Sequence, residues 1–427
     1  MFGIILGLIV LMVLAYLGWS IIWIAPIAAG VVALTGGLDL LDAYKDTYMG
    51  GFVDFAKAWF PVFMLGAVFG KLMEDTGMAR SVAVSLTKVI GTKRAILGVL
   101  VSSAVLTYGG VSLFVVVFAV YPLALALFKE ANITRRLIPG TVALGAFTFT
   151  MTAVPGTPQI QNLIPMEYFE TDAMAAPVMG IIATLVMGAG GYFYLVKREK
   201  KLTADGETYT DPEDENMVSN EEDIPHFILS ILPLLAVLLT LNLLKWDIVL
   251  ALISGIVLIM LLSIPKFKKF VKAINGGAIG SVTAIVNTSA AVGFGTVVKV
   301  VPGFEKLTEM LLGIKGNPLI SEAVAVNILA GATGSASGGM GIALEALGSK
   351  YYEIAMDTGI SPEAFHRVAS LASGGLDTLP HNGAVLTLLT ITGMSHKDSY
   401  RDIFVVACVI PVIAVVVAIL FASIGIY

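Results

Sequence analysis

An acid and an imidazole flank a proline within an apolar part of the sequence. Asp377 and His381 lie four residues apart around Pro380. Ionisable residues inside a membrane are energetically costly and mark ion pathways and proton relays, and imidazole exchanges a proton near neutral pH. This pair is therefore a candidate for binding and releasing a proton. The equally weighted alternative is that His381 caps a half-helix or is otherwise structural.

Four clusters of small residues and prolines interrupt apolar stretches of the chain. Glycine and proline break helices, and the second half of a broken helix begins with free N–H groups and a partial positive charge. Such a start suits an anion, most simply a carboxylate. The clusters are TYGGVS (107–112), AVPGTPQIQN (153–162), GATGSASGGMG (331–341) and LDTLPHNGAV (376–385).

Close helix packing is the alternative explanation for these clusters, because small residues let membrane helices approach one another. Packing does not explain why prolines follow at matched positions, Pro155 and Pro380. We therefore predict helix breaks that line a cavity enclosed by protein, where irregular backbone is tolerated.

The composition indicates a membrane protein. Hydrophobic residues make up 57% of the chain and charged residues 13%, with a mean hydropathy of +0.89, whereas soluble domains carry about 25% charged residues. Runs long enough to cross about 30 Å of hydrocarbon predict an all-α polytopic fold with ten to twelve spanning or half-spanning segments.

Motifs of soluble enzymes are missing from the sequence. It has no phosphate loop, dinucleotide fingerprint or zinc-ligand spacing, and its one cysteine, Cys408, excludes an intramolecular disulfide. We expect no enzymatic activity, catalytic residue, cofactor or bound metal, and no nucleic-acid partner. Cys408 is expected to be buried.

An acidic polar stretch divides the chain into two halves. Residues 197–225 contain 4 basic and 10 acidic residues and no apolar periodicity. We predict a first membrane repeat over 1–196, an acidic cytoplasmic linker over 197–225 and a second repeat over 226–427. The halves resemble each other at an offset of roughly 220 to 228 residues, which indicates an internal repeat: TYGGVS falls opposite GSASGGM, and VPGTPQ opposite LPHNGA.

The distribution of basic residues predicts that the repeats are inverted. Lysines and arginines follow apolar segments at 197–201 and 266–272, so both places should be cytoplasmic. The first-half loop equivalent to the second place, residues 38–51, holds one lysine and three aspartates and is expected outside. Both termini would then lie outside the inner membrane, an arrangement typical of secondary transporters.

Other charged residues are expected in less specialised places. Glu322 and Glu345 lie among apolar residues, and an interfacial position stays open for both. His366 with Arg367 is expected in a solvated loop or at a helix end. Glu74 and Asp75 are expected at a helix end.

Several segments resemble the gluconate permease (GntP) family of proton symporters, within a larger ion-transporter superfamily. They occur in family order over nearly the whole chain: LGAVFGKLMEDTGMARSVAVSL (65–86) with IGTKRA after it, TYGGVS, GATGSASGGMG and ASGGLDTLPHNG. The resemblance implies an inverted-repeat carrier of small organic anions, with broken helices and re-entrant hairpins around the site.

The same resemblance implies which residues line that site. Proton coupling is assigned to Asp377 and His381 because they are the ionisable residues beside the break at Pro380. Substrate binding falls to Tyr108, Gly109, Gly110, Ser112, Pro155, Gly156, Thr157, Ser335, Ser337, Gly338, Gly339 and Asn382.

One departure bears on the substrate. The family carries an acidic residue shortly after its His and Asn, whereas this chain has His381-Asn382-Gly383. That change disfavours a polyhydroxylated sugar acid and is closer to the branch associated with short hydroxy acids such as 3-hydroxybutyrate.

We therefore expect proton-coupled symport of a small monocarboxylate, such as 3-hydroxybutyrate or gluconate, into the cell. The expected partners are the organic anion and the lipid bilayer, and a homodimer is left open. The alternatives are a sodium-coupled carrier of di- or tricarboxylates, whose Na⁺ would bind at the same breaks, and an ion exchanger or channel without an organic substrate. A structural membrane scaffold would not require matched breaks.

Overall fold

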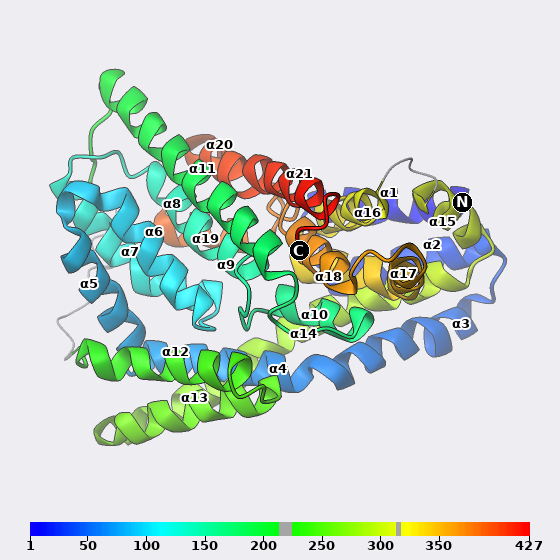
Figure 1. Cartoon of the computed structure of the whole chain (residues 1–427), viewed down its shortest axis with the longest axis horizontal. Helices are drawn as coiled ribbons and strands as arrows, with labels where there is room; N and C mark the ends of the chain where they lie inside the picture. The colour runs from blue at the N-terminus through cyan, green and yellow to red at the C-terminus, as the bar shows by residue number, and fades with distance from the viewer. Residues whose placement is uncertain (213–223, 313–316) are drawn as a thin grey trace.

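The computed structural model describes residues 1–212, 224–312 and 317–427, and in these ranges the chain is helical without a strand (Figure 1). The predicted all-α polytopic class is confirmed. Within the described residues, eight shorter apolar helices accompany five helical stretches that are long and apolar enough to span a membrane: Leu40–Asp75, Leu113–Glu130, Pro177–Ala204, Ile264–Val300 and His396–Ala422.

The elements of the two halves follow one another in a similar order. The first half comprises α1 Phe2–Tyr16, α2 Ile21–Gly36, α3 Leu40–Asp42, π-helical η1 Ala43–Tyr48, α4 Met49–Asp75, α5 Met78–Ile90, η2 Thr92–Arg94, α6 Ala95–Tyr108, α7 Leu113–Glu130, α8 Leu137–Ala146, α9 Phe149–Thr152, α10 Ile160–Phe169 and α11 Pro177–Ala204. The second comprises α12 Phe227–Asn242, α13 Ile248–Leu262, η4 Ile264–Lys269, α14 Phe270–Val300, α15 Gly303–Leu312, α16 Pro318–Thr333, α17 Ala336–Thr358, α18 Pro362–Ser373, α19 Gly383–Thr392, α20 His396–Phe404, η5 Val405–Val409 and α21 Ile410–Ala422.

Matched helices begin at a nearly constant separation along the chain. Helix α1 begins at Phe2 and its counterpart α12 at Phe227. Helix α6 begins at Ala95 and its counterpart α16 at Pro318. Both separations fall within the offset predicted from the sequence, so the repeat extends through the helical elements.

The long helices α4 and α14 are matched elements that pack side by side in opposite directions (Figure 1). Lys266, just before α14, donates from Nζ to the carbonyl of Thr76, just after α4, over 2.9 Å. At the other end, Gly51 near the start of α4 lies against Thr296 near the end of α14. The end of one helix meets the start of the other, so the two repeats are inverted.

The two halves also exchange packing partners. Helix α10 of the first half packs on α17 and α18 of the second, and α19 of the second half packs on α7 and α8 of the first. Figure 1 shows this exchange, with α19 beside α8 and α10 beside α18. Each half thus contributes one short helix to the core of the other.

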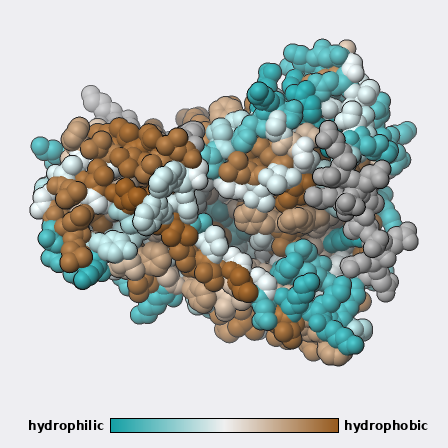
Figure 2. Space-filling view, turned by 180° about the vertical axis from the view of Figure 1, so that it is seen from behind, coloured by the Kyte–Doolittle hydropathy of each residue, from teal (hydrophilic) through white to brown (hydrophobic). Residues whose placement is uncertain are grey.

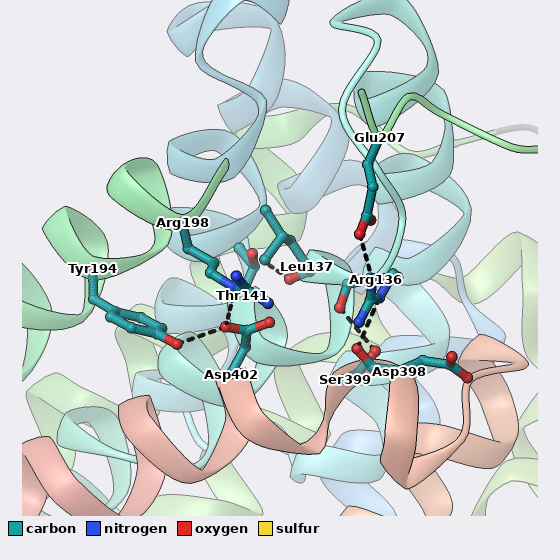
Figure 3. Close-up of polar contacts among 9 residues, drawn as sticks. All are labelled: Arg136, Leu137, Thr141, Tyr194, Arg198, Glu207, Asp398, Ser399 and Asp402. Atoms are coloured by element: carbon teal, nitrogen blue, oxygen red, sulfur yellow. Dashed lines mark hydrogen bonds and ion pairs between the residues drawn. The ribbon is translucent and has the colours of Figure 1, made fainter. Parts of the chain in front are cut away.

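A polar network links α8, α11 and α20 at one end of the molecule (Figure 3). Arg198 on α11 and Tyr194 both bond the buried carboxylate of Asp402 on α20, over 3.2 and 2.7 Å. Arg136, beside α8, pairs with Glu207 and also donates to a backbone carbonyl of α20. Hydrophilic surface gathers at this end, on the right in Figure 2, while apolar surface spreads over much of the remaining face.

The predicted linker is partly structured. Helix α11 continues through its first residues to Ala204, and Asp211 pairs with Lys129 over 2.7 Å. Residues 213–223 of the predicted linker lie outside the described residues.

Candidate functional site

All four predicted clusters contain a helix break. Helix α6 ends before residues 109–112, α9 before 153–159, α16 before 334–335 and α18 before 374–382. In GATGSASGGMG only Gly334 and Ser335 are non-helical, because Gly334 adopts a positive φ of 60° that ends α16. The other glycines of that cluster lie within helices.

Each break is followed by the N-terminus of a half-helix. Ser335 caps α17, and its hydroxyl accepts from the Gly338 N–H over 3.1 Å. Asn382 caps α19, and its side chain accepts from the Val385 N–H over 2.9 Å. In the first half, α7 begins after Ser112 and α10 after Gln159, neither of which makes a side-chain cap bond. The first-turn amides of a helix have no partner in the helix itself and can bind an anion.

The breaks of the second half line a cavity of about 350 Å³. Side chains and backbone of the first half close it, among them Phe147, Met151 and Gln161. The structure brings together here these predicted site residues: Ser335, Ser337, Gly338, Asp377, His381 and Asn382.

The breaks of the first half line a second cavity of about 480 Å³. Of the predicted residues, Gly110 and Ser112 lie here, with Gln159. Phe63 and Gln161 line both cavities, so the two spaces adjoin. Helix starts from both repeats therefore surround two adjoining cavities.

Three side-chain oxygens in the wall of the first cavity have no hydrogen-bond partner within the described ranges: Gln161 Oε1, Asn287 Oδ1 and Asp377 Oδ1. A buried acceptor without a donor is unfavourable, so a ligand with hydroxyl groups or a proton would satisfy these atoms. Sequence reasoning named neither Gln161 nor Asn287 as site residues. The signal for Gln161 was its place in AVPGTPQIQN, and that for Asn287 was the polar run Asn287-Thr288-Ser289 within a long, mostly apolar helix.

Asn382 joins the two breaks of the second half. Its side-chain amide donates to the carbonyls of Gly334 and Asp377 over 2.9 and 2.8 Å. The His381 ring lies against Gly334, where an added Cβ would come within 2.7 Å of it. Asn382 therefore supports the cavity wall through bonds within the protein, and Gly334 must remain small.

Several predicted first-half residues make bonds within the protein and do not line either cavity. The Tyr108 hydroxyl donates to the Pro155 carbonyl over 3.2 Å, and the Thr157 hydroxyl to the Thr150 carbonyl over 2.8 Å. The Gly156 carbonyl accepts from the Asn242 side chain over 2.9 Å. These groups hold the first-half breaks in shape.

Two predicted glycines serve close packing. A Cβ on Gly339 would lie 2.2 Å from backbone atoms of Ala330, and a Cβ on Gly109 would lie 2.6 Å from Leu234. These two glycines are therefore explained by close helix packing, because a side chain at either position would displace a neighbouring helix.

His366 and Arg367 are both fully buried, so the prediction that they are solvated is wrong. The Arg367 guanidinium donates to the Ala175 carbonyl over 2.6 and 3.1 Å and to Asn162 Oδ1 over 2.8 Å. It also lies 3.4 Å from the Thr152 carbonyl. These acceptors come from the first half, far earlier in the chain, so local sequence gave no sign of them.

Inverted helical repeats whose broken helices meet around buried cavities define a polytopic membrane transporter. Residues 1–244 match the family described as GntP family permease. The chain belongs to this family, as the sequence resemblance predicted.

Two relatives that are described as transporters agree with this assignment. The chain is 44% identical over 450 residues to the uncharacterized transporter YxjC of Bacillus subtilis (strain 168), covering 95% of each chain. It is 27% identical over 192 residues to an uncharacterized transporter of Haemophilus influenzae, covering 45% of this chain and 43% of that protein.

The fold also has a counterpart among solved structures. The crystal structure of the Alcanivorax borkumensis YdaH transporter, described as having an unusual topology, aligns with a TM-score of 0.61. The alignment covers 91% of this chain and 90% of the other at 15% identity. The likeness is one of fold.

Proposed function

We propose that this permease carries a small organic monocarboxylate into the cell together with a proton, across the inner membrane. A short hydroxy acid such as 3-hydroxybutyrate, or gluconate, is the proposed substrate. The observation that carries the proposal is the meeting of half-helix N-termini with unpartnered side-chain oxygens around one cavity. Amides supply donors for a carboxylate, and the oxygens supply acceptors for a hydroxyl.

The substrate carboxylate would bind at the starts of α17 and α19. The N-terminal amides and the helix dipole favour negative charge there. The Ser337 hydroxyl lies 3.3 Å from the Thr288 hydroxyl in the same cavity and can turn toward the substrate. The substrate hydroxyl would donate to the oxygens of Gln161 or Asn287.

Asp377 gives the cavity a physical reason to couple substrate to a proton. Its carboxylate lies in the wall where the anion would bind, and two negative charges in a poorly solvated cavity repel each other. A proton on Asp377, exchanged through His381, removes that repulsion and lets the anion enter. Release of the anion then favours release of the proton.

The proposed orientation places the linker and the positively charged loops in the cytoplasm and both termini outside. Lys129 and Arg136 lie at the same end of the molecule as the linker residues Asp211 and Glu207. The positive-inside preference assigns such an end to the cytoplasm. A homodimer remains part of the proposal for the assembled carrier.

Uptake into proteoliposomes tests the proposed function. Purified protein would be assayed with labelled 3-hydroxybutyrate and gluconate under an inward proton gradient, with protein-free liposomes as control. We expect saturable uptake that collapses when a protonophore removes the gradient. Absence of gradient-driven uptake of any short hydroxy acid would contradict the proposal.

A sodium-coupled carrier of di- or tricarboxylates is the second candidate. The three unpartnered oxygens of the cavity are hard ligands of the kind that alkali and alkaline-earth cations prefer. Replacing sodium with choline during uptake separates the two functions. The proton-coupled carrier is indifferent to this replacement, whereas the sodium-coupled carrier stops.

A further inference from the structure

Glu322 on α16 is a buried acid that lines neither of the cavities described above. Its side chain is fully buried, and neither carboxylate oxygen has a hydrogen-bond partner in the parts of the chain that the structure describes. An ionised carboxylate without a partner is strongly unfavourable in such surroundings. This buried site therefore favours the neutral, protonated carboxyl group of Glu322 over the ionised one.

Three of the helices packed against α16 supply no buried charge to Glu322. Helices α1 and α21 carry no acidic or basic side chain, and the amino group at the start of α1 lies against Gly303. The charged residues of α15, which are Glu305, Lys306 and Glu309, are exposed.

The two other helices packed on α16 are α17 and α18. Tyr351 of α17 is the titratable group that faces this region, and its hydroxyl bonds Ser321 over 3.0 Å. The remaining ionisable residues of α17 and Glu363 of α18 are exposed or partly exposed. His366 and Arg367 of α18 are bonded to residues of the first half. No cation from these helices is therefore placed to balance an ionised Glu322.

The other repeat shows that the fold does not need an acid here. Helices α6 and α16 are matched elements that begin at Ala95 and Pro318, and aligning these starts places Val99 opposite Glu322. Val99 is as fully buried as Glu322. An apolar side chain satisfies the packing at this place, and the acid requires another explanation.

Helix α16 connects Glu322 mechanically to the cavity. The helix ends at Thr333, about 16 Å along its axis from Glu322, and Thr333 lines the cavity. Gly331 on the same helix packs tightly on Leu376, next to Asp377. Any displacement of α16 thus moves Glu322 together with the wall of the substrate cavity.

We propose that Glu322 is a second proton-binding site, which exchanges its proton with water when α16 moves between the outward-open and inward-open states. The carboxylate takes a proton from hydronium in the external solution, which leaves as water, and gives it to a water molecule on the cytoplasmic side. One further proton thus crosses with each substrate. This role rests on the proposed function.

Infrared spectroscopy tests the bound proton independently of transport. The difference spectrum between the wild type and Glu322→Gln at neutral pH should show the C=O stretch of a protonated carboxyl group in the wild type. Glu345→Gln is the matched control, because Glu345 on α17 is partly exposed and paired with Lys299 at 3.6 Å. The absence of a protonated-carboxyl band assigned to Glu322 would overturn the proposal.

Proton-driven accumulation tests the coupling. For a gradient of one pH unit, each coupled proton multiplies the limiting accumulation about tenfold, so Glu322→Gln should lower it about tenfold while counterflow persists. Glu322→Val introduces the valine found at the matched position of the first repeat. It should lower accumulation by the same factor as Glu322→Gln, which would show that the loss does not come from the glutamine amide. Unchanged accumulation in both variants would overturn the role of Glu322 and leave the proposed function standing. Substrate uptake by the wild-type protein that is driven by a sodium gradient and not by a proton gradient would overturn the proposed function. The infrared band would still show whether Glu322 is protonated.

Discussion

The helix breaks of the two repeats have the same place in the fold but differ in how their polar groups are satisfied. At the break over 153–159 in the first repeat, Asn162 donates to the Thr157 carbonyl. Arg367, from the second repeat, bonds Asn162 and the Thr152 carbonyl just before the break. In the second repeat, Asn382 ties the break together while Asp377 keeps an unpartnered oxygen in the cavity wall.

This difference indicates that the two repeats have separate roles, one structural and one in binding. Helices α8 and α18 begin at Leu137 and Pro362, and aligning these starts places Val142 opposite Arg367. Val142 is fully buried, so the cation that fixes the first break has no counterpart at the second. One break is held rigidly by bonds within the protein, and the other retains groups that can bind a proton or a substrate.

Removing Arg367 should have the largest effect, because it breaks the first of the two regions. Arg367→Ala removes both guanidinium bonds from the buried Ala175 carbonyl, at about 1–3 kcal/mol. It also takes one donor from the Thr152 carbonyl, which keeps Ser370, and one from the Asn162 oxygen, which keeps His366. We expect little folded protein. The single buried thiol, Cys408, provides the measurement, since a thiol-reactive fluorophore reports unfolding on heating. Arg367→Lys should recover part of the stability, and a wild-type melting temperature for Arg367→Ala would contradict the comparison.

Neutralising Asp377 should break the second region without unfolding it. Asp377→Asn keeps the shape of the side chain and mimics the protonated acid, so counterflow of the substrate should continue. Accumulation under a gradient of one pH unit should fall by about tenfold or more. The same thiol assay should give a melting temperature close to that of the wild type. Full accumulation in this variant would show that Asp377 does not carry a coupled proton.

The two serines before α7 and α17 sharpen the comparison. The Ser335 hydroxyl accepts from Gly338 N–H, whereas the Ser112 hydroxyl makes no cap bond. Ser335→Ala should therefore lower stability by about 1 kcal/mol, and Ser112→Ala should lower it less. Thermal melts check stability, and the KM for uptake separates a loss of capping from a loss of substrate contact. Equal destabilisation by both substitutions would contradict the assigned caps.

The smallest effect is expected at an exposed ion pair near the first break. Lys245 and Asp172 lie 2.6 Å apart, with about half of each side chain exposed. Although burial raises the pKa of Asp172, the bonds from Lys245 and from the Met174 amide lower it below its ordinary value. The pair therefore stabilises the fold when the pH is above the pKa of Asp172 in the unfolded chain. This stabilisation is lost as the pH falls through the lower pKa of Asp172 in the folded protein. Lys245→Ala should cost less than about 1 kcal/mol at neutral pH and low salt, and melts at acid pH should show no difference.

The fold was predictable because its signals are local or periodic. Apolar runs predicted the helices, and the clusters of small residues and prolines predicted all four breaks. The charge asymmetry between the loop 38–51 and residues 266–272 predicted inverted repeats, which the antiparallel packing of α4 and α14 confirms.

The site was less predictable because its members depend on packing between distant segments. Ser335, Asp377 and His381 were found, since their cluster marks the break directly. Gln161 reaches the cavity only because the halves exchange helices. Arg367 was misplaced because a charged residue on an amphipathic helix normally faces water, and its acceptors come from the other repeat.

The exchange of α10 and α19 between the halves also sets the order of assembly. Contacts between the two halves form late, because segments far apart in the chain must first be brought together. During synthesis, α4 and α10 enter the membrane before their partners α14, α17 and α18 exist. The faces of α4 and α10 that pack on these helices therefore stay uncovered until the second half is inserted. Neither repeat completes its core alone, and biogenesis is as much a joint task of the two halves as transport.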